Sequence, residues 1–348
     1  MNQKFQNAIR GVPQKTPPIW FMRQAGRYHK HYQALRAKHS FMDLCKVPEL
    51  ATEVALGPVE DFDFDVSILF SDLLFPLETL GMGLEYTDQG PRLGWHLTPE
   101  NIRNLKTPAE ALKGLEFQKE AVALTRKKLP SDKSLIGFVG GPWTLFVYAM
   151  EGGHAGSLTQ AKSHLSLFNS FCEVMTPLLM ENIQLQLQGG AEAVMVFDTA
   201  AGEVSPMIFQ NYIQPQLEKI ARSAPGKLGY YSKGTTTSHF SRQGEWNTDF
   251  SSLWIGMGFD HRFDLAYFLK KKNQVSPKGF VQGNFDQSLL FLPPQEFKTQ
   301  LMKYLEPFQK LSESERAGWV SGLGHGVLPK TPEENVRTFV KTVREVFS

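Results

Sequence analysis

The chain has 348 residues, of which 41% are hydrophobic and 21% are charged, and its formal net charge is +2. These values are typical of a globular protein with a sizeable core, and so balanced a charge gives no reason to expect binding to nucleic acid or to a membrane surface. No apolar run approaches the roughly 20 residues that a membrane-spanning helix requires.

The two cysteines, Cys45 and Cys172, lie far apart in the sequence. Such sparse cysteine usage fits a reducing compartment and offers neither a disulfide framework nor a thiolate metal site. The first residues are polar and lack the apolar segment of a secretory signal. We therefore expect a cytoplasmic protein without a metal centre, whose N-terminus is flexible over about residues 1–12.

Short apolar runs alternate with amphipathic segments along the whole chain. Eight of these runs predict strands: Pro18–Met22, Val66–Phe70, Ser134–Val139, Ala193–Phe197, Lys227–Tyr231, Leu253–Met257, Gly279–Gln282 and Trp319–Gly322. The interval Ser232–Phe250 is polar and lacks a clear period, so we expect a long functional loop there. Gly152–Ser157 predicts a second flexible loop.

Two of the predicted helices are well marked. Within Lys162–Gln188 the apolar residues recur three or four apart, and Pro177 predicts a kink. For the last helix, Thr331 and Glu334 have the spacing of a capping box, and Pro332 occupies the first turn.

Eight strands alternating with helices predict a single-domain (β/α)8 TIM barrel over residues 1–348. The alternative is a doubly wound open sheet, which would need a glycine-rich phosphate turn after an early strand. Gly137–Gly141 matches that turn only weakly. Because barrel active sites lie at the C-terminal ends of the strands, the residues that follow each strand are the candidate site.

Two arginines follow the first predicted strand. Arg23 and Arg27 are four residues apart around Gly26, so both side chains can converge on one ligand. Surface ion pairing is the alternative, but no acidic residue occurs between positions 4 and 42. Arginine binds carboxylates through two hydrogen bonds and stays charged at any working pH, so we favour anion binding.

Asp72 follows the second strand and is flanked by leucine and phenylalanine on both sides. It either caps the next helix or holds a single negative charge in an apolar setting, where a developing positive charge could meet it. Burial would raise the pKa of this carboxyl group and nearby arginines would lower it, so we expect the ionised form.

Tyrosine and histidine candidates follow later strands. Tyr148 lies beyond the third strand and is either a core residue or a hydroxyl donor to a ligand. Asp198 and Thr199 follow the fourth strand. His325 follows the last one between two glycines, where no packed helix face holds it, so its imidazole can reach a ligand.

These residues fall within motifs that resemble the uroporphyrinogen decarboxylase family. The motifs are PPIWFMRQAGRY (17–28), FSDLL (70–74), GGPWTL with Tyr148, and GLGHGVLPKTPEENV (322–336), and the likeness runs from about Pro17 to Val346. The resemblance implies a single-domain barrel, usually a homodimer, that works without a metal or an organic cofactor. It implies a reduced tetrapyrrole with eight carboxylates as substrate, and the loss of four acetate carboxyl groups as CO2 in haem biosynthesis.

The resemblance also assigns roles to single residues. It implies that Asp72 is the central aspartate, that Tyr148 and His325 are active-site groups, and that the substrate is bound by the following residues as well: Arg23, Arg27, Arg36, Ile68, Phe197 and Thr199. The source of the proton that replaces CO2 stays open among His325, a bound water and the carboxyl group of the substrate, because arginine is a poor general acid.

The sequence departs from the family at two places. His29-Lys30-His31 stands where the family has an acid and a further arginine, and we expect these residues to be solvated rather than to bind a metal. His261 stands where the family has tryptophan after aspartate.

Two other functions are kept as alternatives. A corrinoid methyltransferase of the same superfamily would need zinc held by soft ligands, which Cys45 and Cys172 do not supply at the required spacing. A non-catalytic tetrapyrrole carrier would keep the arginines, but in a carrier Asp72 would only repel an anionic ligand.

Overall fold

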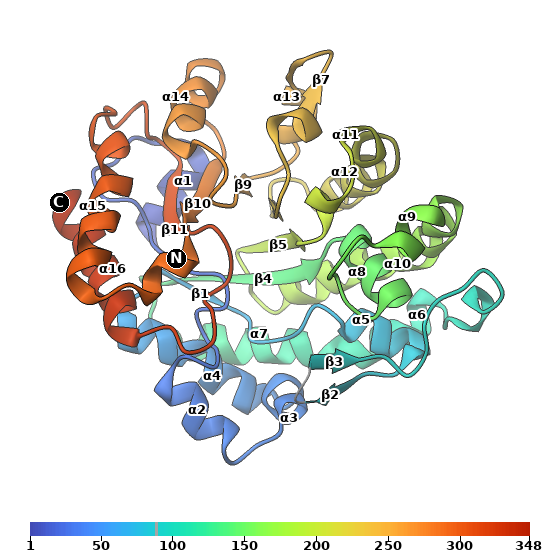
Figure 1. The fold of residues 1–348 in the computed structure, drawn as a ribbon. Coiled ribbons are helices and arrows are strands. Elements are labelled where there is room, and N and C mark those ends of the chain that lie inside the picture. The colour runs from blue at the N-terminus through green and yellow to red at the C-terminus, as the bar shows by residue number, and fades with distance from the viewer. Residues whose placement is uncertain (88–89) are drawn as a thin grey trace.

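The computed structural model describes residues 1–87 and 90–348. Its centre is a parallel sheet with the strand order β1-β4-β5-β6-β9-β10-β11 (Figure 1). The strands are β1 (Val66–Ile68), β4 (Ser134–Gly140), β5 (Ala193–Asp198), β6 (Leu228–Ser232), β9 (Gly256–Gly258), β10 (Phe280–Phe285) and β11 (Trp319–Leu323). Seven of the eight predicted strands are therefore confirmed as members of one curved sheet.

The first predicted strand is reduced to one bridge. Ile19 pairs in parallel with Ser321 of β11, and the Ile19 carbonyl also accepts a hydrogen bond from the Asp65 N–H beside β1. The Ile19 N–H donates to the Asp65 side chain at 2.9 Å instead of to a neighbouring strand. Pro18 has no N–H to donate. This segment thus lies between the two outer strands of the sheet without forming a regular ladder.

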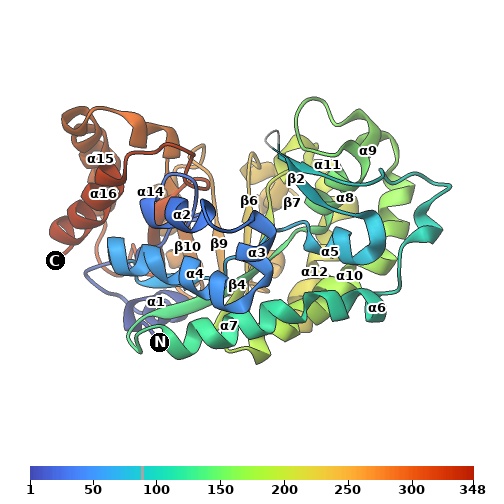
Figure 2. The same cartoon turned by 90° about the horizontal axis from the view of Figure 1, so that it is seen from below.

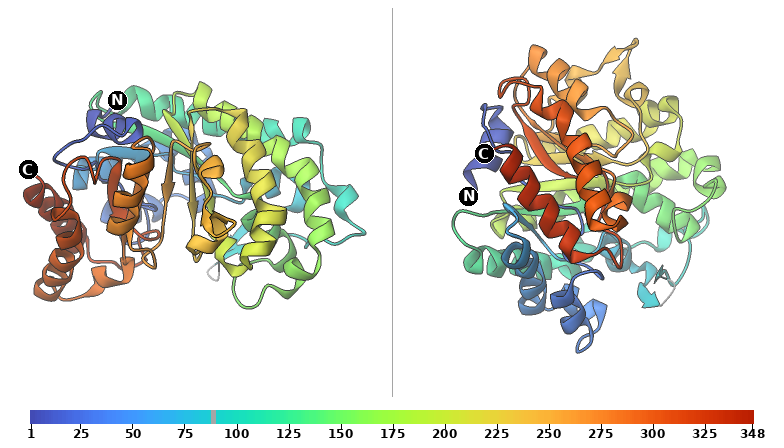
Figure 3. Two further views of the ribbon diagram at one scale, coloured as in Figure 1. Left: turned by 90° about the horizontal axis from the view of Figure 1, so that it is seen from above. Right: turned by 60° about the vertical axis from the view of Figure 1, so that its left-hand side comes forward.

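Helices surround the sheet, and their packing follows the order of the strands. They are α1 (Gln3–Arg10), α2 (Lys30–Arg36), α3 (Phe41–Lys46), α4 (Pro48–Phe62), α5 (Phe75–Leu77), α6 (Pro108–Leu112), α7 (Glu116–Lys128), α8 (Pro142–Glu151), α9 (Thr159–Ser163), α10 (Leu165–Gln188), α11 (Pro206–Ile208), α12 (Gln214–Ser223), α13 (Thr248–Ser251), α14 (Leu265–Val275), α15 (Pro294–Gln309) and α16 (Glu333–Val346). Neighbouring helices pack from α15 through α16, α4, α7 and α10 to α12 (Figure 3).

Alternation along β5 explains how one strand serves two layers. Ala193, Met195 and Phe197 belong to an inner cluster, whereas Val194 and Val196 pack in the larger outer cluster that includes the helices. Successive side chains of a strand point to opposite faces, so a continuous apolar run is what a sheet buried on both faces requires.

The N-terminal segment that we expected to be flexible over about residues 1–12 contains helix α1. The Asn2 side chain caps this helix by accepting from the Phe5 N–H. Phe5 and Ala8 are buried in the inner cluster, and the Phe5 ring lies 5.6 Å from that of Phe280 at the start of β10. Helix α1 therefore packs against the N-terminal ends of the strands, opposite the ends that carry the candidate site.

Two antiparallel hairpins were not predicted. β2 (Glu85–Thr87) pairs with β3 (Gly90–Arg92), and β7 (Ser241–Arg242) pairs with β8 (Glu245–Trp246) within the segment expected to be a loop. Figure 2 shows the first hairpin beside α3, where the Tyr86 and Phe41 rings are 4.4 Å apart.

The predicted capping box of the last helix is wrong. The Thr331 hydroxyl donates to the Leu328 carbonyl at 2.8 Å, and Pro332 is the N-cap residue of α16. The hydroxyl therefore closes the preceding turn rather than the helix end. Among the described residues, no helix is both long and apolar enough to cross a membrane.

Candidate active site

The loop that carries Arg23 is pinned to the sheet edge. Gln24 is buried, accepts from the Phe21 N–H and donates to the Val66 carbonyl. The Tyr28 hydroxyl donates to the Gln24 carbonyl at 2.7 Å. Arg23 itself has a φ of 57°, a left-handed conformation that is costly for a residue with a side chain. The surrounding hydrogen bonds hold this backbone in place and leave the guanidinium exposed.

Arg23 and His325 are brought together by a close backbone contact. The Val327 N–H donates to the Met22 carbonyl at 2.9 Å, which ties the loop after β11 to the loop after Ile19. A methyl group at Gly326 would lie 2.6 Å from the Arg23 side chain, so only glycine leaves room for it. The N-terminal and C-terminal motifs are therefore in contact at this point of the fold.

His325 is a neutral imidazole in this setting. Burial, reinforced by Arg23, Lys233, His154 and His261, lowers its pKa to about 3. The Tyr231 hydroxyl donates to the Gly324 carbonyl at 2.7 Å and lies 3.1 Å from His325 Nδ1. A hydroxyl has one proton, so its oxygen accepts from an Nδ1–H, and Nε2 is left as an acceptor.

Asp72 is half-buried. Its contacts support both predicted roles, a cap for the next turn and a single negative charge in an apolar setting. Its Oδ1 accepts from the Leu74 N–H at 2.9 Å, so the side chain does cap the turn that leads into α5. Burial raises the pKa of the carboxyl group, while Tyr86, the Leu74 N–H and Arg23 lower it. The same carboxylate thus caps a turn and lies within electrostatic reach of Arg23.

Tyr148 lies within electrostatic reach of both Asp72 and Arg23. It is half-buried on α8, and its ring packs 5.5 Å from that of His154. Burial and the negative charge of Asp72 raise the pKa of its hydroxyl, and Arg23 lowers it. Within the described parts of the chain this hydroxyl has no hydrogen-bond partner, so it is available to a ligand.

Helix α8 is anchored by Asp198, a fully buried residue at the end of β5. Its Oδ1 accepts from the Thr144 hydroxyl at 2.6 Å and from the Thr144 N–H at 3.2 Å, at the start of α8. Burial raises the pKa of this carboxyl group to about 6. We assign Asp198 a structural role, because Oδ1 accepts from the helix that positions Tyr148 and Oδ2 accepts from the Tyr230 hydroxyl at 3.4 Å.

The apolar candidates lie beneath this group of polar residues. Ile68 and Phe197 are buried members of the inner cluster, in which the Phe197 ring contacts Phe138 and Tyr231. Thr199 is buried directly after β5.

Arg27 and Arg36 contact a different part of the loop region. Both side chains are exposed and act on the pKa of Tyr32, which burial raises and these arginines lower. The Arg36 guanidinium donates to the His39 carbonyl at 2.9 Å. Arg23 thus acts on Asp72, Tyr148 and His325, whereas Arg27 and Arg36 act on Tyr32.

The expectation that His29 is solvated is wrong. His29 is fully buried, and its Nε2 lies 2.6 Å from Asp61 Oδ2 on α4. Burial lowers the pKa of this imidazole, although Asp61 opposes the shift. His31 is half-buried against Gly57, where a methyl group would clash with its ring. These two histidines pack α2 against α4 instead of being surrounded by solvent.

Several residues near the site were not predicted. Lys233 follows β6 directly, His154 lies in the Gly152–Ser157 loop, and His261 follows β9; all three act on His325. Tyr86, on the unpredicted β2–β3 hairpin, acts on Asp72. The strand-end rule could have identified Lys233, whereas the hairpin left no signal in the sequence pattern.

A zinc donor set is not assembled in the described residues. Cys45 lies in α3 and Cys172 in α10, both buried, and burial raises the pKa of each thiol. Residues 1–87 and 90–348 contain no group of three or more His, Cys, Asp or Glu side chains that could hold a metal ion.

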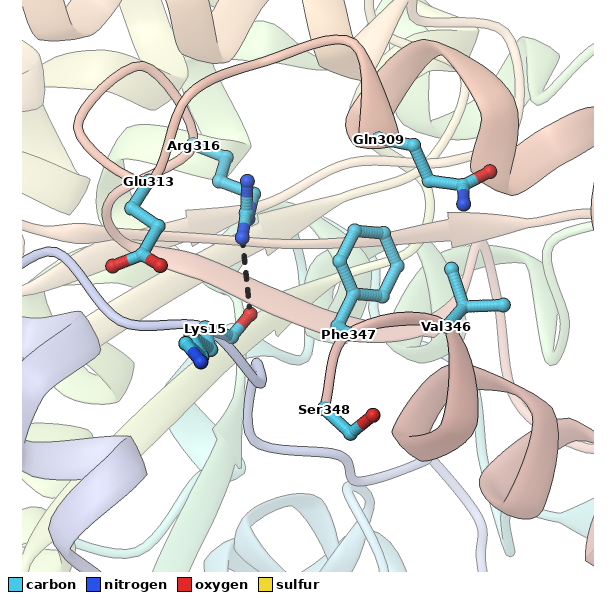
Figure 4. Close-up of a pocket in the computed structure, with 7 residues that line it drawn as sticks. All are labelled: Lys15, Gln309, Glu313, Arg316, Val346, Phe347 and Ser348. Carbon is cyan, nitrogen blue, oxygen red and sulfur yellow. Dashed lines mark hydrogen bonds between the residues drawn. The ribbon is translucent and has the colours of Figure 1, made fainter.

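A surface hollow of about 240 Å³ lies away from the strand ends, between the N-terminal segment and α16 (Figure 4). In it Arg316 donates to the Lys15 carbonyl and lies 5.3 Å from the Phe347 ring. These contacts tie the two ends of the chain together, so we assign the hollow a structural role. Its lining residues are Lys15, Gln309, Glu313, Arg316, Val346, Phe347 and Ser348.

Comparison with known proteins decides the family. The model of the family "Uroporphyrinogen decarboxylase (URO-D)" matches residues 1–346. The chain belongs to the uroporphyrinogen decarboxylase family. Among curated members, the uroporphyrinogen decarboxylase of Pelobacter propionicus is 33% identical and that of Pseudoalteromonas atlantica is 34% identical. The alignments cover 99% of this chain in both cases, and 99% and 96% of the respective relatives.

The fold is also found in a more distant solved structure. A methyltransferase from Methanosarcina mazei superposes with a TM-score of 0.78 at 19% identity, covering 100% of this chain and 99% of the other. At this identity the likeness supports the fold only. The family match therefore rests on the sequence, and the geometry above shows how this member arranges its side chains.

Proposed function

We propose that the chain is a uroporphyrinogen decarboxylase that removes CO2 from the four acetate side chains of uroporphyrinogen III to give coproporphyrinogen III. The observation that carries the proposal is one half-buried carboxylate, Asp72, within electrostatic reach of Arg23 and Tyr148 at the C-terminal edge of the sheet. In a carrier for an anionic ligand, that carboxylate would serve only to cap the turn at Leu74.

The chemistry gives Asp72 a task that the other site residues cannot perform. Loss of CO2 from an acetate on a pyrrole needs an electron sink, which the ring becomes when one of its carbons is protonated. A carboxylate in a partly desolvated position stabilises the resulting cation strongly. It can also accept hydrogen bonds from the pyrrole N–H groups, which would hold the substrate in one pose.

The basic residues then bind the carboxylates of the substrate. We propose that Arg23 and Arg27 make these contacts first, with Arg36 at the outer rim, while Ile68, Phe197 and Thr199 form the surface beneath the ring. Tyr148 donates a hydrogen bond to the substrate. Arginine suits this role because its planar fork matches a carboxylate.

His325 enters the proposal as an uncharged hydrogen-bond acceptor. With its pKa lowered to about 3, the free imidazole carries no proton on Nε2 at neutral pH. Of the three candidate proton sources, this argues against His325 and favours a bound water or the carboxyl group of the substrate. The imidazole then orients a substrate N–H or a protonated carboxyl group rather than neutralising a charge.

We further propose that the whole chain, residues 1–348, is one catalytic (β/α)8 barrel in which the segment around Ile19 acts as the eighth strand. The Asp65 N–H donates to the Ile19 carbonyl on one side, and on the other side Ser321 bonds to the backbone of Pro18 and Trp20, which supports this arrangement. A cytoplasmic homodimer that binds no nucleic acid or membrane is the expected form, and sedimentation of the purified protein tests the dimer.

Anaerobic incubation with uroporphyrinogen, followed by separation of products by carboxyl number, tests the function. We expect stepwise loss of carboxyl groups and an unchanged rate after treatment with a chelator, since the proposal needs no metal or organic cofactor. Persistence of the octacarboxylate, bound but unchanged, would favour a carrier. Loss of decarboxylation on zinc removal would contradict the metal-free mechanism proposed here.

A further inference from the structure

Lys233 is the first residue after β6 and is held firmly at its backbone. Its carbonyl accepts from the Gly202 N–H at 3.0 Å, and its N–H donates to the Asp198 carbonyl at 3.4 Å. The next residue, Gly234, donates to the buried Asp260 side chain at 2.6 Å. A methyl group at Gly202 would overlap the Gly234 backbone, so the two turns are in direct contact. The position of Lys233 is thus fixed from both sides.

The ammonium group of Lys233 has no such partner. The side chain is half-buried, and among residues 1–87 and 90–348 it makes no ion pair or hydrogen bond. The neighbouring carboxylates are engaged elsewhere: Asp260 pairs with Arg262 at 2.8 Å, and Asp198 binds Thr144.

Tyr231 on β6, two positions before Lys233, is buried in the inner cluster, and its hydroxyl lies 3.1 Å from His325 Nδ1. The positive charge of Lys233 lowers the pKa of His325 together with Arg23, His154 and His261. It also lowers the pKa of His154, which Glu203 opposes from an exposed position. Side chains two positions apart on a strand point to the same face, so the side chain of Lys233 starts on the same side of the sheet as Tyr231 and His325.

We propose that Lys233 binds a carboxylate of the substrate and acts with Arg23 as a further cation of the site. This inference rests on the proposed function. Lys233 and Arg23 both act on His325, and like charges held at one site repel until an anion lies between them. An ammonium group is a compact point charge that tolerates several carboxylate orientations, which suits acetate and propionate groups on a flexible ring.

Kinetics of Lys233→Gln under anaerobic conditions test the inference. We expect KM for uroporphyrinogen to rise about 10-fold, equivalent to about 1.4 kcal/mol, while kcat changes by less than about 3-fold, because the lost contact is made equally before and during the reaction. Lys233→Arg should restore most of the affinity. The KM of the wild type should also rise more steeply with salt than that of Lys233→Gln.

Lys227→Gln is the matched control. Lys227 precedes the same strand, β6, at its opposite end, and its side chain is exposed. We expect its KM to equal that of the wild type. Thermal melting of all variants detects any loss of structure, and Lys233→Met, which keeps the aliphatic stem, replaces the glutamine variant if that variant does not fold.

An unchanged KM in Lys233→Gln or Lys233→Met would overturn the inference, as would a loss of kcat at constant KM. If the wild type does not decarboxylate uroporphyrinogen, the proposed function fails by itself. Equilibrium binding of uroporphyrinogen then decides the role of Lys233: about 10-fold weaker binding by the glutamine variant supports it, and equal binding refutes it.

Discussion

Replacing Asp72 by asparagine separates the two roles that the structure gives this side chain. The amide oxygen can still accept from the Leu74 N–H, since asparagine and aspartate cap helix starts about equally well. The substitution removes the negative charge and turns one carboxylate oxygen into an amide donor. If Asp72 were merely a cap, Asp72→Asn would have wild-type activity.

The size of the expected loss follows from the position of the carboxylate. Two unit charges about 4 Å apart near a protein surface interact with about 4 kcal/mol at an effective dielectric constant of about 20. Because Asp72 is half-buried, this is the appropriate regime. Removing that stabilisation from a cationic transition state lowers kcat by about 10³.

The assay is single-turnover decarboxylation of uroporphyrinogen under anaerobic conditions, with products separated by carboxyl number. Asp264→Asn is the control, since Asp264 caps α14 through the Tyr267 N–H at 3.0 Å and lies outside the proposed site. We expect wild-type rates for the control and unchanged melting for both variants. A rate for Asp72→Asn within about 3-fold of the wild type would refute the electrostatic role.

Three further predictions concern stability, each measured by chemical denaturation. Asp198→Ala should lower the free energy of unfolding by about 1–3 kcal/mol, because it leaves the buried Thr144 N–H and hydroxyl without their acceptor. Phe5→Ala should lower the free energy of unfolding by about 3–5 kcal/mol, since the ring is buried against Phe280 at the N-terminal ends of the strands. Its KM for the substrate should not change. For His325, the folded pKa of about 3 lies below the ordinary 6.5, so the unfolded chain binds a proton that the folded chain does not, and stability falls as the pH drops below about 6.5. His325→Gln should therefore lose less stability than the wild type between pH 7 and pH 5.

Different outcomes would contradict each of these. Wild-type stability of Asp198→Ala would mean that the Thr144 groups find water or another acceptor. Wild-type stability of Phe5→Ala would mean that α1 detaches readily from the sheet. Parallel loss of stability on acidification in His325→Gln and the wild type would mean that this imidazole is not held neutral by its surroundings.

The fold was predictable where one physical rule decided the structure. Continuous apolar runs such as Ala193–Phe197 can be buried only between two layers, and they are the strands of the sheet. This rule predicted one strand too many, because a side-chain hydrogen bond replaced a bond between strands. Ile19 donates to the Asp65 side chain, so its apolar run yields a single bridge.

Short polar elements gave no pattern to detect. The hairpin that carries Tyr86 has strands of three residues each, too short for a period to appear. The capping-box spacing of Thr331 and Glu334 was present, but the hydroxyl bonds to the preceding turn instead. A threonine hydroxyl can bond either to the helix that follows or to the turn that precedes it, and the spacing of residues in the sequence does not tell which bond forms.

For the candidate site, strand ends indicated Arg23, Asp72 and His325, because parallel strands deliver their C-terminal residues to one edge. The contacts between these residues were not predictable. The proximity of Arg23 and His325 depends on Gly326 and on the Val327–Met22 hydrogen bond, which join segments about 300 residues apart in sequence. His29 was misjudged for the same reason, since its partner Asp61 lies on another helix.

A crystal structure grown anaerobically with coproporphyrinogen, the expected product, tests the central claim most directly. The account predicts pyrrole N–H groups within hydrogen-bond distance of the Asp72 carboxylate and propionates in contact with Arg23. A tetrapyrrole bound elsewhere, or an Asp72 side chain that makes no contact with the ring, would contradict it.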